Sequence, residues 1–115
     1  MSCTRACDAG LVDVELLVVP DCPNEVAAGR VLLEAVRLAG IEDVRVGVTV
    51  VGTDDEAQRL NFVGSPTFLI GGVDPFAVAG SAVGLTCRIY WGPAGRSGVP
   101  DVAALRDALA KACIA

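Results

Sequence analysis

Apolar residues recur along the chain in two patterns, a short and nearly continuous run typical of a buried strand and a helical spacing of three to four residues. The first run, Val14–Val19, is apolar at nearly every position, as expected for a strand buried on both faces. Residues 24–39 follow with a helical period that keeps their charged residues in one stripe and leaves a broad apolar surface. Gly40 is suited to end that helix.

A second strand and helix follow the same logic. Residues 44–51 alternate valine with polar or small residues, which predicts a half-buried strand. A strand, a helix and a strand of these lengths form a βαβ unit, so the two strands should be parallel. Thr53 and Glu56 have the spacing of a capping box, which predicts a short helix ending near Leu60.

The second half of the chain predicts two more strands and a last helix. Thr67–Ile70 reads as a strand, and the segment Gly72–Leu85 after it is longer than a hairpin loop requires. Thr86–Trp91 is rich in β-branched and aromatic residues, which favours a fourth strand. Asp101 can cap a final helix that reaches about Ala112. The predicted order is therefore β-α-β-α-β-β-α, an α/β protein.

Composition narrows the class of protein. The 115 residues are 53% hydrophobic, which suits one packed domain, here residues 13–115, after a flexible tail over residues 1–12 that carries Cys3 and Cys7. The net charge of −5 argues against a nucleic-acid partner. No apolar run approaches the ~18–20 residues of a membrane span. The first ten residues lack the apolar segment of a secretory signal, so we expect a cytoplasmic protein without a membrane partner.

Candidate chemistry centres on Cys22, which lies between the first strand and the first helix. The chain has five cysteines and no histidine, an odd count that favours reactive or metal-seeking thiols. Pro23 suits the first position of a helix, which would make Cys22 the N-cap, with its sulfur facing the free N–H groups of Asn24 and Glu25. A thiol in that position is favoured as the reactive thiolate. The alternative is that Cys22 is a small apolar plug at the junction.

The sequence resembles the thioredoxin-like superfamily in its order of elements and at a few motifs. The residues that match the superfamily are Cys22, Pro23 and Ser65-Pro66-Thr67. A closer likeness, to one group of small proteins within it, extends over the motifs Cys22-Pro23-Asn24, Gly64-Ser65-Pro66-Thr67, Asp74-Pro75-Phe76 and Gly84-Leu85-Thr86-Cys87-Arg88-Ile89-Tyr90. The resemblance implies a four-stranded mixed sheet with helices on both faces and a nucleophilic thiol at Cys22. It also implies that Pro66 is a cis-proline beside that thiol, and that Pro23, Ser65, Pro66 and Thr67 contact substrate. The motifs look closest to small bacterial thioredoxin-like proteins associated with organomercurial lyase and mercury resistance.

One position departs from the resemblance. Glu25 stands where a thioredoxin has the second cysteine of its C-x-x-C pair, so the chain would exchange disulfides with one cysteine. The mixed disulfide would then be resolved by Cys87, by Cys7 or Cys3 on the tail, or by an external thiol. Cys87 faces a difficulty, because the fourth strand of a plain thioredoxin sheet starts at the end away from the active site. The alternative for Cys87 is a buried strand residue.

Two other functions remain open. The protein could bind or transfer a soft metal such as mercury, with Cys22, Cys87, Cys3 and Cys7 as candidate ligands, because thiolates suit such ions. It could instead be a non-catalytic interaction domain of the same fold, in which case it is not an enzyme. The sequence has no phosphate-binding or dinucleotide-binding motif, so we expect no cofactor. The expected partners are proteins or small molecules that carry thiols or disulfides.

Overall fold

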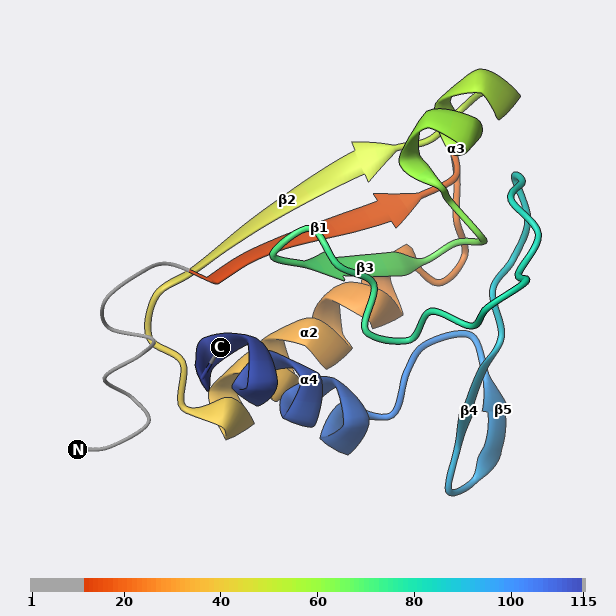
Figure 1. Ribbon diagram of the computed structural model, residues 1–115. Coiled ribbons are helices and arrows are strands. Elements are labelled where there is room, and N and C mark those ends of the chain that lie inside the picture. The colour runs from red at the N-terminus through yellow and green to blue at the C-terminus, as the bar shows by residue number, and fades with distance from the viewer. Residues whose placement is uncertain (1–11, 115) are drawn as a thin grey trace.

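A three-stranded mixed sheet separates two helices on one face from a single helix on the other (Figure 1). The structure is a computed structural model, and it describes residues 12–114. The elements in chain order are β1 (Val12–Val18), α2 (Glu25–Ala39), β2 (Val44–Val50), α3 (Asp54–Leu60), β3 (Thr67–Ile70), β4 (Tyr90–Gly92), β5 (Gly95–Ser97) and α4 (Val102–Ile114). The predicted α/β class is confirmed.

Strand β1 is the centre of the sheet, whose order is β2-β1-β3. It runs parallel to β2, with Val12 opposite Val44 and Val18 opposite Val50. It runs antiparallel to β3, with Leu17 opposite Thr67. The parallel pair joined by α2 is the predicted βαβ unit. Since β1 ends beside the start of β3, the turn that contains Cys22 and the turn that contains Pro66 lie at the same end of the sheet, measured along the strands.

The predicted four-stranded sheet is wrong. Residues 86–89 form no strand, and only Cys87 makes an isolated bridge, with Ser65. Tyr90–Gly92 turns away instead and pairs with Gly95–Ser97 in a separate hairpin. Two features account for the difference. The Arg88 side chain donates hydrogen bonds to Asp74 and to the Phe76 carbonyl in the loop after β3. Gly95 adopts a positive φ of +107°, which favours glycine and closes the hairpin.

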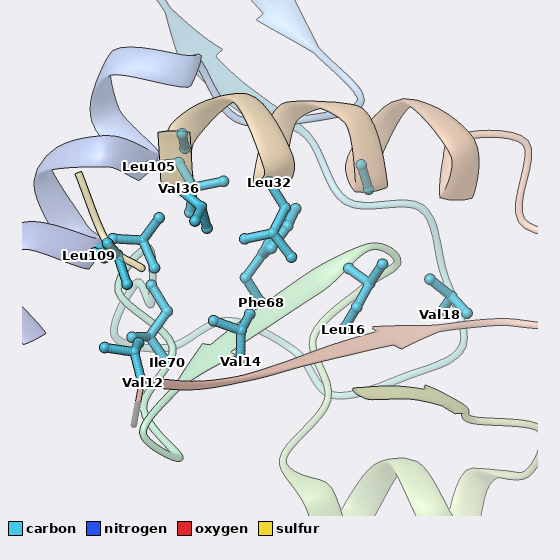
Figure 2. Close-up of a cluster of buried hydrophobic side chains, with 13 residues drawn as sticks. Val12, Val14, Leu16, Val18, Leu32, Val36, Phe68, Ile70, Leu105 and Leu109 are labelled. Carbon is cyan, nitrogen blue, oxygen red and sulfur yellow. The ribbon is translucent and has the colours of Figure 1, made fainter. Parts of the chain in front are cut away.

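The larger core cluster fills the space between the sheet and helices α2 and α4 (Figure 2). It contains alternate residues of β1 together with residues of β3 and both helices, including Val14, Leu16, Val18, Leu32, Val36, Phe68, Ile70, Leu105 and Leu109. Leu17 points to the opposite face of the sheet and packs with Ala57 of α3 and with Phe62. The prediction that this strand is buried on both faces therefore holds at Leu17, whereas Glu15 on the same face is half-buried.

Strand β2 is less covered than its pattern predicted. Val44 contacts the large core cluster, but Val46, Val48 and Val50 remain 42%, 52% and 53% exposed. Their register places them on the same face as Val14, Leu16 and Val18. They are exposed because β2 is an edge strand, and the two helices pack over β1 and β3.

The helix ends follow local chemistry. The Thr53 hydroxyl accepts a hydrogen bond from the Glu56 N–H, and the Glu56 carboxylate accepts one from the Thr53 N–H, so the predicted capping box is confirmed. Hydrogen bonds to this carboxylate, above all from the Gly52 N–H, lower the pKa of Glu56. Asp101 accepts a hydrogen bond from the Ala104 N–H at the start of α4, as a cap should.

The N-terminal tail lies almost wholly outside the described residues, including Cys3 and Cys7. Val12, the last residue of the predicted tail, belongs to β1 and is buried in the core. Strand β1 therefore begins two residues before its predicted start. Between residues 12 and 114, the structure has no helix with the length and apolar character to cross a membrane.

Candidate functional site

Cys22 lies in the turn between β1 and α2, where its sulfur meets Ser65. Its side chain is a free, half-buried thiol. The Ser65 hydroxyl donates a hydrogen bond to Cys22 Sγ at 3.0 Å and accepts one from the Val19 N–H at 3.1 Å. A backbone amide, a buried hydroxyl and the sulfur thus form one chain of hydrogen bonds. The expected proximity of Cys22 to the Pro66 turn is present in the structure.

Cys22 is not the N-cap of α2, contrary to the sequence-based expectation. The cap is Asn24, whose carbonyl accepts the first helical hydrogen bond from the Ala28 N–H at 2.8 Å. The Cys22 carbonyl accepts only a turn bond from the Glu25 N–H, at 3.3 Å. The proline therefore belongs to the turn before the helix. In the described part of the chain, the hydrogen bond to Sγ comes from Ser65 rather than from the helix.

The four residues expected to contact substrate differ in their access. Pro23 is exposed, whereas Ser65, Pro66 and Thr67 are buried. The Ser65–Pro66 peptide bond is cis, as the resemblance implied. The backbone of Ser65 is already paired within the chain, because its N–H donates to the Thr86 carbonyl at 2.8 Å and its carbonyl accepts from the Arg88 N–H at 3.0 Å. Substrate contact by these residues stays a prediction.

Cys87 is an exposed free thiol directly opposite Ser65. The two hydrogen bonds of Ser65 to the residues on either side of Cys87 make Ser65 and Cys87 a parallel bridge pair. The alternative, in which Cys87 is a buried strand residue, is therefore wrong. The predicted difficulty, that Cys87 would lie at the end of the sheet away from the active site, also disappears, because segment 86–88 lies at the end of the sheet that holds Cys22. Ser65 thus contacts Cys22 through its side chain and pairs with Cys87 through its backbone.

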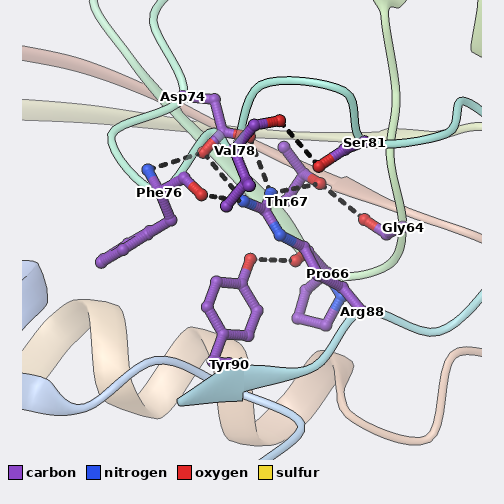
Figure 3. Close-up of polar contacts among 9 residues, drawn as sticks. All are labelled: Gly64, Pro66, Thr67, Asp74, Phe76, Val78, Ser81, Arg88 and Tyr90. Atoms are coloured by element: carbon purple, nitrogen blue, oxygen red, sulfur yellow. Dashed lines mark hydrogen bonds and ion pairs between the residues drawn. The ribbon is translucent and has the colours of Figure 1, made fainter. Parts of the chain in front are cut away.

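The side chain of Arg88 is buried in a network that sequence reasoning did not anticipate (Figure 3). Its Nη1 donates to Asp74 Oδ2 at 2.7 Å and to Thr67 Oγ1 at 3.2 Å. Its Nη2 donates to Asp74 Oδ1 at 3.3 Å and to the Phe76 carbonyl at 2.8 Å. The guanidinium group therefore ties the loop after β3 to the first residue of β3, and it fixes the backbone next to Cys87.

Tyr90 extends this network to the Pro66 turn. Its hydroxyl donates to the Pro66 carbonyl, as Figure 3 shows. Its ring meets Phe76 edge to face at 5.5 Å between centroids, and the Arg88 guanidinium lies 4.8 Å from the ring centroid. Burial raises the pKa of Tyr90 well above its usual range, so the hydroxyl stays a hydrogen-bond donor.

Gly64 completes the support of the site. Its φ is +140°, which L-residues with a side chain rarely adopt, and a Cβ built there would lie 2.8 Å from Arg88 Cβ. Only glycine allows the segment 86–88 to approach the Pro66 turn this closely. The motif G-S-P-T signalled this turn, but nothing in the motif C-R-x-Y indicated that its arginine and tyrosine point inward. A sequence signal that could have indicated the buried ion pair is an arginine within a stretch of β-forming residues, here Arg88, preceded by an aspartate in a long loop, here Asp74.

The surroundings of Cys87 include a cavity but no cluster of metal-binding residues within the described part of the chain. A cavity of about 480 Å³ lies beside Cys87 and is partly lined by Val63, Phe76, Val78 and Trp91. Across residues 12–114, no three or more His, Cys, Asp or Glu residues lie together in a group that could hold a metal ion. The candidate ligands Cys3 and Cys7 lie outside those residues.

Comparison with known proteins gives no family assignment. No protein-family model, curated protein or solved structure matches the chain.

Proposed function

We propose that the protein exchanges thiols and disulfides through Cys22, on a thioredoxin-like variant of the α/β fold. The observation that carries the proposal is the 3.0 Å hydrogen bond from the Ser65 hydroxyl to Cys22 Sγ. Ser65 immediately precedes the cis bond to Pro66 and is fully buried. The resemblance implies a thiol beside the Pro66 turn, and the hydrogen bond from Ser65 is a further contact that the resemblance did not imply.

The hydrogen bond favours exchange chemistry for a physical reason. The thiolate is the nucleophile in disulfide exchange, and a donor directed at the sulfur stabilises that charged form. The Ser65 hydroxyl has one proton, which it donates to the sulfur, while its oxygen accepts a hydrogen bond from the Val19 N–H. The half-buried Cys22 remains partly open to an approaching disulfide.

The step is an ordinary thiol–disulfide exchange. Cys22 Sγ, as the thiolate, attacks one sulfur of a substrate disulfide and forms a new S–S bond. The substrate S–S bond breaks, and its second sulfur leaves with the electron pair and takes a proton from water. The substrate class is therefore a disulfide of a protein or of a low-molecular-weight thiol.

Alkylation kinetics test this proposal. In the intact chain at neutral pH, iodoacetamide should modify Cys22 faster than the exposed Cys87, with peptide mapping used to read both sites in one sample. Ser65→Ala should slow Cys22 about threefold to fourfold. One hydrogen bond to a charged group contributes about 1.5 kcal/mol, which changes the thiolate fraction about tenfold, and the greater nucleophilicity of the less stabilised thiolate offsets part of that change. Cys87 serves as the internal reference, and Ser81→Ala removes an exposed hydroxyl as the matched control. Equal rates at both cysteines, unchanged in Ser65→Ala, would contradict the proposal.

A second candidate function, binding of a soft metal ion, has one observation in its favour. Cys22 contacts the Ser65 side chain and Cys87 pairs with the Ser65 backbone, so the fold brings two cysteines to one residue, and thiolates select soft ions. A competition titration with Hg²⁺ against free cysteine tests this candidate. Affinity no tighter than that of two free cysteines, or affinity unchanged in Cys87→Ser, would dispose of it.

A further inference from the structure

Segment 86–88 pairs with the backbone N–H and carbonyl of Ser65 as an added strand would. Thr86 accepts from the Ser65 N–H, and Arg88 donates to the Ser65 carbonyl. In such a bridge the two opposed residues lie about 4.8 Å apart across the strands, and their side chains project to the same side. The side chain of Cys87 therefore projects to the side on which the Ser65 hydroxyl meets Cys22 Sγ.

Several contacts hold this segment in place. The guanidinium of Arg88 is fixed by Asp74, Thr67 and the Phe76 carbonyl. On the other side, Arg88 packs against Gly64 so closely that no side chain fits between them. Cys87, next in sequence, is exposed and free. The fold therefore presents an accessible thiol at a fixed position next to the residue that bonds Cys22.

We propose that Cys87 is the resolving thiol for Cys22 and that the two form an internal disulfide during the reaction. This inference rests on the proposed exchange function and adds the partner of the nucleophile. Cys22 contacts the side chain of Ser65 and Cys87 pairs with the backbone of Ser65, so both cysteines adjoin one residue. A disulfide requires Cα atoms within about 7 Å. The tail cysteines and external thiols are then not needed to release the substrate.

The reaction balances in two exchanges. Cys22 first forms a mixed disulfide with one half of the substrate disulfide, and the other half leaves as a thiol. Cys87 then loses its proton to water and attacks Cys22 Sγ, which breaks the mixed disulfide and releases the second half as a thiol. The substrate disulfide gains two electrons, and the two protein thiols lose them. A low-molecular-weight monothiol, oxidised to its own disulfide, restores the reduced protein.

The test uses a chain whose other cysteines, Cys3, Cys7 and Cys113, are replaced by serine. The probe is a chromogenic aryl disulfide, added at one equivalent to the reduced protein, with intact mass measured over time. With both remaining thiols present, two aryl thiolates should be released for each protein, no adduct should persist, and mapping should find the Cys22–Cys87 disulfide. In Cys87→Ser, one thiolate should be released, and the aryl group should remain on Cys22.

The outcomes separate the two proposals. A stable aryl adduct on Cys22 while Cys87 is present and reduced would overturn the resolving role and leave exchange at Cys22 intact. Failure of Cys22 to react in Cys87→Ser would overturn the exchange function and this inference with it. Circular dichroism of each variant shows that the fold is retained, and Cys87 is exposed, so its replacement by serine should be tolerated. Two thiolates released without a trace of adduct would support both proposals.

Discussion

Replacing Arg88 by methionine should destabilise the protein by about 3 kcal/mol. Removing one partner of a buried ion pair costs about 3–5 kcal/mol, because the other charge is left desolvated and unpaired. The side chains of Arg88 and Asp74 are 9% and 16% exposed, so some water reaches the carboxylate, and the lower end of that range applies. Methionine keeps the apolar stem of the arginine, which separates the loss of the charge from the loss of packing.

Chemical unfolding followed by circular dichroism measures this cost. Arg106→Met is the matched control, because the Arg106–Asp107 pair is 41% and 62% exposed and should contribute less than about 1 kcal/mol. In a double-mutant cycle, Asp74→Asn should recover part of the loss in Arg88→Met, since the amide leaves no buried charge. A cost for Arg88→Met no larger than that of the control would refute the reasoning.

Three further changes give measurable results. Gly64→Ala should lower the free energy of unfolding by at least about 2 kcal/mol, because of the positive φ at Gly64 and the clash of the new Cβ with Arg88. Gly29→Ala, in open space on a helix, should raise it by about 0.5–1 kcal/mol, and urea unfolding midpoints compare the two variants. The raised pKa of Tyr90 contributes stability that is fully present below pH about 10 and is lost above it, by at most about 1.4 kcal/mol per pH unit. In unfolding experiments at increasing alkaline pH, Tyr90→Phe should lack this loss of stability, and an identical loss in the variant would contradict the role of Tyr90. Thr53→Ala should cost about 1 kcal/mol in urea unfolding by removing the α3 cap, and an unchanged midpoint would argue against the capping role.

The regular elements were predictable where one local rule decides the structure. The nearly continuous apolar run of β1 and the capping box of α3 each depend on residues near in sequence, and each is present. The fourth strand failed because β propensity in Thr86–Trp91 does not specify a partner. Whether those residues join the sheet depends on Arg88 and on the hairpin closed by Gly95, which involve contacts distant in sequence.

The site was predictable in part. The motifs around Cys22 and Pro66 placed two junctions at the same end of the sheet, and the structure brings Cys22 and Ser65 into contact. The position of Cys87 was not predictable, because it follows from the bridge to Ser65 and the inward turn of Arg88. Helix capping at Cys22 failed because the chain makes a turn before the helix begins at Glu25.

The Val19 amide offers a spectroscopic handle on the sulfur. Its proton is bonded to the Ser65 oxygen, whose own proton points to Cys22 Sγ, so a change at the sulfur alters the second bond and through it the first. Alkylation or oxidation of that cysteine should therefore shift the Val19 resonance in an amide correlation spectrum, although this backbone group never touches the reagent. The end of the central strand thus reports, from inside the protein, the chemical state of a residue that meets solvent.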